Sequence, residues 1–151
     1  MTSSIKNLEN CQISNKSNIP INSIDISCIL NKFCYIENEN NIIIDHHYFK
    51  QYIKITNDSI ISLNHLINQI ENVLKQYDNF NVHLKIKSLT LFEIDKHKDL
   101  IAMMSLILKQ KFPDKLKNCM IYDAPFIFSS LFSIISSFID KDTQKKIQLI
   151  K

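Results

Sequence analysis

Glycine and arginine are both absent from this sequence of 151 residues. Loops that cradle nucleotide phosphates, the turn that presents a nucleophilic serine and the calcium loop of an EF-hand all need backbone conformations that glycine readily provides. The lack of glycine therefore argues against nucleotide-dependent enzymes of these kinds. The lack of arginine argues against sequence-specific nucleic-acid binding, because bidentate contacts to guanine and phosphate favour the planar arginine fork. We expect no nucleic-acid partner.

Long apolar runs, a signal sequence and paired cysteines are lacking as well. No apolar run reaches the roughly 18–20 residues that are needed to span a bilayer, and the chain begins with a polar segment. The cysteines stand at positions 11, 28, 34 and 119 without a C-x-x-C pair, so we expect reduced thiols. The formal charge of +3 is compatible with an acidic membrane surface. We predict a cytoplasmic protein that can associate peripherally with membranes.

The length of the chain suits one domain with a single sizeable core. Residues 1–25 are rich in serine, asparagine and lysine and are weakly periodic, so we predict a flexible or poorly ordered leader. Residues 26–151 form the predicted domain, and we expect it to be a monomer.

Hydrophobic periodicity predicts alternating strands and helices in this domain. Asp58 can cap a long helix, in which apolar residues recur at helical spacing from Ile60 to Tyr77. Pro113 ends a second helix over residues 92–111, and Pro125 suits the first turn of a third. Strands are predicted at 42–44, 48–55, 82–86, 119–122 and 147–150, and a short helix or strand at 24–35. This alternation predicts an α/β fold with parallel strands, right-handed crossovers and helices packed against the sheet.

Candidate metal and catalytic groups are sparse. His46 and His47 are adjacent on a predicted strand, where side chains point to opposite faces, so they cannot easily share one ion. His83 and His97 lack cysteine or carboxylate partners at ligand spacing. A dyad of Cys119 with a histidine is the remaining catalytic alternative, although a cysteine inside an apolar strand is usually inert. We expect no metal, no cofactor and no enzymatic activity.

The stretch from residue 124 to 139 contains no charged residue. Phe128, Leu131, Ile135 and Phe138 form one broad apolar face of the predicted helix, and serines form a narrow hydroxyl stripe. The stretch is too short to span a bilayer but can lie in the interfacial plane. Two interpretations remain open. The helix is either buried in the core, or it is a lid with one face on the sheet and the other on an apolar ligand or lipid.

Several segments of the second half of the chain follow one another in a characteristic order. They are the predicted strand and the segment after it at residues 82–91, Phe112-Pro113-Asp114-Lys115-Leu116, Met120-Ile121-Tyr122-Asp123-Ala124-Pro125, and Thr143-Gln144-Lys145-Lys146-Ile147. Their order and spacing resemble the CRAL-TRIO lipid-binding domain, the fold of yeast-type phosphatidylinositol-transfer proteins, tocopherol-transfer protein and retinaldehyde-binding protein. The family pattern is a strand-end turn, Tyr-Pro-Glu-Arg-Leu, Asn-Ala-Pro, a Phe-rich helix and a Lys-Ile strand. The resemblance covers residues 81–150.

The resemblance implies a mostly parallel sheet as the floor of a hydrophobic cavity, with the Phe-rich helix as its gate. The gate and cavity residues would be Phe126, Phe128, Leu131, Phe132, Ile135 and Phe138. The phosphoinositide-binding branch holds its head group with an acidic residue, a threonine and a lysine, which fall on Asp114, Thr143 and Lys146. A carboxylate accepts from ring hydroxyls, while a lysine neutralises the phosphodiester. The resemblance thus implies binding, and intermembrane transfer, of a phospholipid or other amphiphile, phosphoinositide favoured, by gate opening at a transiently contacted membrane surface.

The chain also departs from the family pattern. Lys85, Ser88 and Asp123 stand where the family has aspartate, glycine and asparagine. Phe80 and Val82 replace the hydroxyl residues that contact phosphocholine, so exchange of phosphatidylcholine is not expected. The chain stops before the segment that normally braces the gate, which implies a domain truncated at its C-terminus. The alternative function is a non-transferring interaction or regulatory module that keeps the fold and fills the cavity with side chains.

Overall fold

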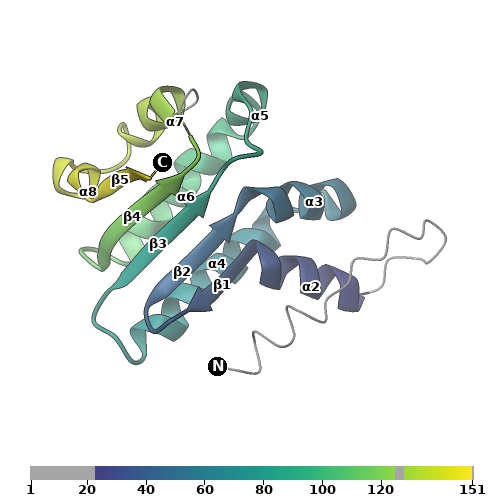
Figure 1. Cartoon of the computed structure of the whole chain (residues 1–151), viewed down its shortest axis with the longest axis horizontal. Helices are drawn as coiled ribbons and strands as arrows, with labels where there is room; N and C mark the ends of the chain where they lie inside the picture. Colours follow the sequence, from purple (N-terminus) through teal and green to yellow (C-terminus); the bar gives the residue numbers. More distant parts are fainter. Residues whose placement is uncertain (1–22, 125–127, 151) are drawn as a thin grey trace.

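The computed structural model describes residues 23–124 and 128–150, and these contain one five-stranded sheet (Figure 1). The strands lie in the order β1 (Cys34–Glu37), β2 (Asn41–Asp45), β3 (Phe80–Lys85), β4 (Leu116–Tyr122) and β5 (Ile147–Ile150). Strands β2 to β5 run parallel to one another, and β1 is antiparallel to β2. The predicted fold class, a mostly parallel α/β sheet, is therefore confirmed.

In the described ranges one helix precedes β1, and the other helices connect the parallel strands. The helices are α2 (Ser23–Phe33), α3 (His46–Thr56), α4 (Ser59–Leu74), α5 (Leu91–Lys96), α6 (Lys98–Lys111), α7 (Phe128–Ile135) and α8 (Lys141–Lys145). Figure 1 shows α4 and α6 behind the sheet, and α5 near α7 at one end of it. The predicted leader lies outside the described residues except for its last three, which form the first turn of α2. No helix in the described ranges is long and apolar enough to cross a membrane.

Helix α4 supplies the main core contact of the sheet. As predicted, Asp58 begins it, because its side chain accepts hydrogen bonds from the backbone N–H groups of Ile60 and Ile61 at 3.0 and 3.4 Å. Leu66 and Ile70 are buried on the face that packs against the sheet. Full burial of such an aliphatic side chain contributes about 1.5–3 kcal/mol. The core cluster comprises Phe33, Cys34, Ile42, Leu66, Ile70, Val73, Phe80 and Val82.

The predicted strand at residues 48–55 is wrong, because this segment is helix α3. Asp45 caps the helix by accepting from the backbone N–H of His47 at 3.0 Å. Asn57 ends it in the left-handed conformation and donates its N–H to the carbonyl of Ile53. The alternation of tyrosine and lysine resembles a strand pattern, whereas the inward residues His46, Phe49 and Tyr52 recur every three positions, as on one side of a helix.

Other differences concern boundaries and thiols. The segment at 24–35 is mostly helix, and it leads directly into the antiparallel strand β1, which the sequence did not reveal. The predicted helix at 92–111 is two helices that meet at His97.

Cys34 and Cys119 are free thiols. Cys28 is disulfide-bonded, so the prediction of reduced cysteines is wrong for this residue.

The face of the sheet opposite α4 and α6 carries a row of amide side chains. Asn41, Asn81 and Asn118 are in register across β2, β3 and β4. The Asn118 amide donates to Asn81 at 3.4 Å, the Asn81 amide donates to Asn41 at 3.3 Å, and Gln148 on β5 donates to Asn118 at 3.4 Å. We refer to these four residues as the amide row. Its members satisfy one another across four strands.

Candidate ligand-binding site

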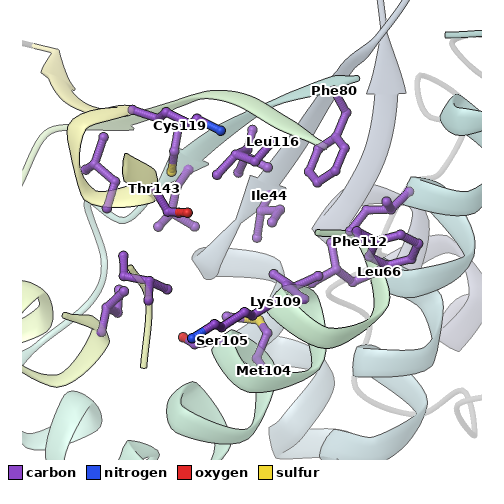
Figure 2. A pocket seen from close by; sticks show the side chains of 18 of the residues that line it. Ile44, Leu66, Phe80, Met104, Ser105, Lys109, Phe112, Leu116, Cys119 and Thr143 are labelled. Atoms are coloured by element: carbon purple, nitrogen blue, oxygen red, sulfur yellow. The ribbon is translucent and has the colours of Figure 1, made fainter. Parts of the chain in front are cut away.

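A cavity of about 330 Å³ lies between the sheet and the helices behind it. In Figure 2, Met104, Ser105 and Lys109 of α6 lie on one side of this space, and Leu116, Cys119 and Thr143 lie on the other. Most of the lining is aliphatic or aromatic. The apolar lining residues are Ile44, Leu66, Ile70, Phe80, Val82, Leu84, Met104, Leu108, Phe112, Leu116, Ile121, Ile135, Ile139 and Ile147.

The three predicted head-group residues, Asp114, Thr143 and Lys146, all line this one cavity. Asp114 follows the end of α6 in a left-handed backbone conformation, with φ of 59°. Thr143 lies in the short helix α8, and Lys146 is its C-cap residue. The carbonyl of Lys146 accepts from the backbone N–H of Cys119 at 2.9 Å, which ties this end of α8 to β4. The fold therefore brings these three residues to one cavity.

Asp140 is a further carboxylate in the lining. Its side chain accepts a hydrogen bond of 2.7 Å from the backbone N–H of Thr143 and thereby caps α8. The hydrogen bonds from Thr143 lower the pKa of Asp140, and the positive charges of Lys109 and Lys146 lower it further. The carboxylate is therefore ionised at neutral pH and lies in the electric field of both lysines.

The predicted gate residues occupy several environments. Ile135 lines the cavity, and so does Ile139 beyond the end of α7. Leu131 is buried in a second core cluster against which Phe128 packs, with Ile86, Ile94, Ile121 and Ala124 as its other buried members. The rings of Phe128 and Phe132 lie 5.5 Å apart. Of the predicted gate and cavity residues that the structure describes, only Ile135 lines the cavity; Phe128, Leu131, Phe132 and Phe138 do not, and Phe126 lies outside the described residues.

The outward face of α7 carries serines. Ser129, Ser130 and Ser133 are exposed, whereas Leu131 is buried. In the described conformation the helix therefore turns its apolar side chains toward the protein and its hydroxyls toward water. This arrangement fits both interpretations from the sequence, a core helix and a closed lid.

Sequence reasoning did not single out Lys109, Ser105 or Asp140 as site residues. Lys109 lies in the last turn of α6, and only the packing of this helix brings it to the lining. Ser105 is buried, and its hydroxyl donates to the carbonyl of Ile101 at 2.9 Å. The polar residues that directly follow the charge-free segment were the only feature of the sequence that could have indicated Asp140 as a site residue. Neither lysine of the lining, Lys109 nor Lys146, forms an ion pair with a carboxylate in the described part of the chain.

Cys119 lines the cavity but is a poor nucleophile. Burial raises the pKa of its thiol to about 12, so the reactive thiolate is scarce at neutral pH. The alternative of an enzyme that uses Cys119 therefore gains no chemical support from its surroundings.

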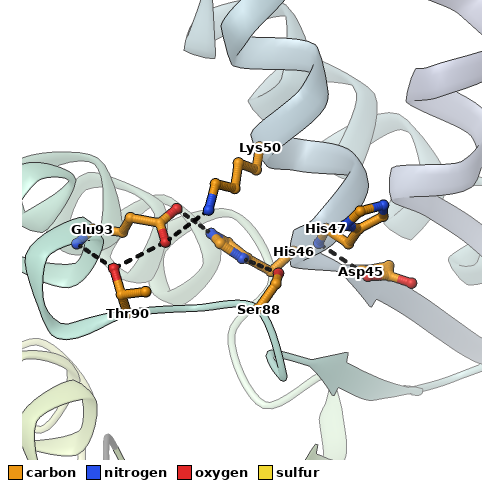
Figure 3. Close-up of polar contacts among 7 residues, drawn as sticks. All are labelled: Asp45, His46, His47, Lys50, Ser88, Thr90 and Glu93. Carbon is orange, nitrogen blue, oxygen red and sulfur yellow. Dashed lines mark hydrogen bonds and ion pairs between the residues drawn. The ribbon is translucent and has the colours of Figure 1, made fainter. Parts of the chain in front are cut away.

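A second polar cluster joins the start of α3 to the loop before α5 (Figure 3). Nδ1 of His46 lies 2.8 Å from the hydroxyl of Ser88, and Nε2 lies 3.5 Å from the carboxylate of Glu93. Because Glu93 can only accept, Nε2 carries the proton of the neutral ring, and Ser88 donates to Nδ1. Burial lowers the pKa of His46, which favours this neutral form.

No sequence motif predicted that Ser88, His46 and Glu93 meet, and the prediction that His46 lies on a strand is wrong. The three residue types are those of a hydrolytic triad, but none of them lines the cavity. Glu93 also accepts from the hydroxyl of Thr90 at 2.9 Å and from Lys50 at 3.4 Å. Its carboxylate thus contacts His46 and Lys50 of α3 as well as Thr90, and the cluster fixes the loop to α3.

No group of three or more histidine, cysteine, aspartate or glutamate side chains in residues 23–124 and 128–150 is arranged to hold a metal ion. His46 and His47 lie in the first turn of α3, and His47 contacts Gln51 at 3.2 Å.

Comparison with known proteins places this fold and cavity in a family. The model of the CRAL/TRIO domain matches residues 43–151, which is well over half of the chain. The chain belongs to the CRAL/TRIO domain family. The resemblance noted in the sequence is thereby confirmed. CRAL/TRIO domains form a family of lipid-binding and lipid-transfer proteins, generally without enzymatic activity.

Among solved structures, the chain is similar to that in "Crystal structure of Sfh5", with a TM-score of 0.68 and 13% sequence identity. The match covers 97% of this CRAL/TRIO chain and 53% of the Sfh5 chain, so the protein spans about half the length of Sfh5. At this identity the similarity shows the fold alone. No curated protein matches the sequence significantly.

Proposed function

We propose that this CRAL/TRIO protein binds one amphiphile, with its apolar chain in the cavity and its head group at Asp114, Thr143 and Lys146. The observation that carries the proposal is the meeting of these residues, from two separate segments, on the lining of a largely apolar cavity. A head group with hydroxyls and a phosphate, such as a phosphoinositide, suits a carboxylate acceptor, a hydroxyl and a free ammonium group.

Helix α7 is the proposed gate. Ile135 forms part of the cavity wall, while Phe128 and Leu131 hold the helix against the neighbouring core cluster. Displacing α7 would remove one wall and open the space to a membrane. Its exposed serines allow the closed helix to face water, and its apolar face becomes available only on opening.

We assign membrane docking to the first residues of α5. Leu91 and Phe92 are adjacent there, and they are 56% and 75% exposed. Helix α5 contacts α7, so docking would occur beside the gate. The start of α5, which carries this pair, is held by the cluster of His46, Ser88 and Glu93. Exposed aromatic and aliphatic side chains at a loop tip gain free energy when they enter the interface of a bilayer.

The alternative is an interaction module with a filled cavity. The open volume of about 330 Å³ favours ligand binding over this alternative. The test is to purify the protein under native conditions, extract it with organic solvent and identify bound lipid by mass spectrometry. We expect an amphiphile in stoichiometric amount, and transfer of labelled lipid between vesicles. Protein that contains no lipid and takes none up from vesicles would contradict the proposal.

A further inference from the structure

One side chain of α8 holds the end of the proposed gate. Nε2 of Gln144 donates hydrogen bonds of 3.2 Å to the backbone carbonyls of Ser136 and Ile139. Both carbonyls belong to the turn that follows α7, and Gln144 lies in the short helix after that turn. Carbonyl groups where a helix ends lack partners within the helix and need an outside donor. The amide group of Gln144 supplies this donor to two of them.

The segment that Gln144 holds belongs to the cavity wall. Ile135 and Ile139 line the cavity, so the turn continues the wall that α7 begins. The backbone N–H of Ser136 donates to the carbonyl of Phe132 at 2.8 Å, so Ser136 has to move with α7. Displacing α7 would therefore pull the Ser136 carbonyl away from Gln144, and their hydrogen bond opposes this motion.

Helix α8, on the other side of this contact, is tied to the sheet. The carbonyl of Lys146 accepts from the backbone N–H of Cys119 on β4 at 2.9 Å. The carboxylate of Asp140 caps the other end of the helix. No residue of α8 is buried, so hydrogen bonds rather than core packing set its position. A ligand that contacts α8 from the cavity would hold this helix more firmly.

On α8 the contact with the gate and the proposed head-group contacts are neighbours. Thr143 lines the cavity and directly precedes Gln144, and Lys146 lines the cavity two positions after it. The helix has only five residues. A head group that contacts both Thr143 and Lys146 would therefore restrict the whole helix, and with it the backbone of Gln144.

We infer that Gln144 is a positioning residue that couples an occupied head-group site to a closed gate. A head group at Thr143 and Lys146 fixes α8, and Gln144 then holds the end of α7. An empty site leaves α8 less firmly held, and the gate opens more readily. Coupling of this kind is reciprocal, so the closed gate also tightens binding of the head group. The inference rests on the proposed function and specifies the regulation of its site.

The rate of lipid release tests the contact. The purified full chain is loaded with phosphatidylinositol that carries a fluorescent acyl chain, and it is mixed with excess phosphatidylcholine vesicles in a stopped-flow instrument. Gln144→Ala should release the lipid about fivefold to tenfold faster, because two hydrogen bonds that hold the closed gate are lost. Gln148→Ala is the matched control, because it removes a glutamine amide from an exposed position of β5 outside the cavity lining. Its release rate should not change, and equal acceleration in both variants overturns the inference.

Two further variants separate hydrogen bonding from packing. Gln144→Glu has nearly the same shape, but its carboxylate can only accept, so it should release lipid at least as fast as Gln144→Ala. Gln144→Lys supplies an ammonium donor to the same carbonyls and should restore slow release. If Gln144→Ala does not fold, this pair carries the comparison. Equal release rates in the pair overturn the inference, and so does an unchanged rate in a folded Gln144→Ala.

Hydrogen exchange tests the coupling itself. Loading with phosphatidylinositol should slow amide exchange in peptides that cover residues 132–139 by about fivefold to tenfold, and Gln144→Ala should abolish this slowing. A contact with a structural role alone would protect these amides equally in the empty and the loaded protein, and that result overturns the coupling. These contrary results leave the proposed function standing. Protein that takes up no phosphatidylinositol overturns the proposed head-group site, and the inference with it.

Discussion

The carboxylate of Asp140 accepts a hydrogen bond of 2.7 Å from the backbone N–H of Thr143, and this contact starts α8 at the lining of the cavity. Asp140→Asn keeps a good capping residue but removes a negative charge beside Lys109 and Lys146. We expect it to tighten binding of an anionic lipid by about twofold to fivefold. Asp140→Ala should weaken binding, because α8 loses its cap. Calorimetric titration of both variants with monooctanoyl phosphatidylinositol checks this, and a change of the same sign in both would contradict it.

Lys146→Ala tests the head-group site without altering the apolar part of the cavity. We expect about a tenfold loss of affinity for phosphoinositide, since a charge-assisted contact is removed, and no loss for an uncharged lipid with the same chain. Lys145→Ala is the control, because Lys145 is its exposed neighbour and does not line the cavity. An unchanged preference for the charged lipid in Lys146→Ala would remove Lys146 from the assignment.

Phe92→Trp reports membrane docking through tryptophan fluorescence, because the unmodified protein contains no tryptophan. On addition of vesicles that contain anionic phospholipid, its fluorescence should shift to the blue and be quenched by brominated acyl chains. Ile60→Trp places the reporter at an exposed apolar position near the start of α4 and should remain unshifted. If both positions shift alike, or Phe92→Trp does not shift, α5 is not the docking tip.

Tyr52→Phe should stabilise the protein. The Tyr52 side chain is 1% exposed, and its hydroxyl has no hydrogen-bond partner in the described part of the chain. Removing this unsatisfied polar group should raise the free energy of unfolding by about 1 kcal/mol. Urea denaturation followed by circular dichroism measures the change. Tyr77→Phe, at a half-buried position, should be nearly neutral, and a destabilised Tyr52→Phe would show that the hydroxyl finds a partner in solution.

Stability should fall in mild acid. Burial lowers the pKa of His46, His65, His83 and His97 from the usual value of 6.5. The unfolded chain therefore binds more protons than the folded chain as the pH drops through about 6.5. The contribution of the neutral histidines to the free energy of unfolding is complete above that pH and is lost below it. Urea midpoints between pH 7.5 and 5 record the loss.

His65→Gln isolates the contribution of one of these histidines to the pH dependence of stability. Nε2 of His65 donates to the carbonyl of Cys34 at 2.8 Å, and a glutamine amide can donate there without titrating. We expect a shallower decline of stability toward acid pH than in the unmodified protein. His47→Gln, at an exposed position of α3, should keep the original decline. An identical decline in both variants would contradict the assignment to His65.

The alternation of strand and helix patterns could reveal the parallel strands. The resemblance to the CRAL/TRIO family, rather than any local pattern, implied the grouping of Asp114, Thr143 and Lys146. The sequence misled at α3, where the deciding signals were the capping residues Asp45 and Asn57 rather than the apolar pattern between them. A strand and a helix of this length can share such a pattern.

Other parts of the site could not be read from the sequence because they depend on tertiary packing alone. Lys109 stands on a helix with mixed polar and apolar surfaces, and nothing in its spacing distinguishes it from Lys111. The contact of His46 with Ser88 joins residues 42 positions apart, without any local motif. The volume of the cavity likewise follows from how Phe80 and Phe112 pack, rather than from their order in the chain.

The amide row from Asn41 to Gln148 has a mechanical consequence. It adds side-chain hydrogen bonds across β2, β3, β4 and β5 to those of the backbone, so sliding one of these four strands past its neighbour would break bonds of both kinds. We therefore expect the sheet to remain rigid and the helices α6, α7 and α8 to move when the cavity opens. The rate at which a lipid enters or leaves would then depend on the motion of these helices and not on motion of the sheet.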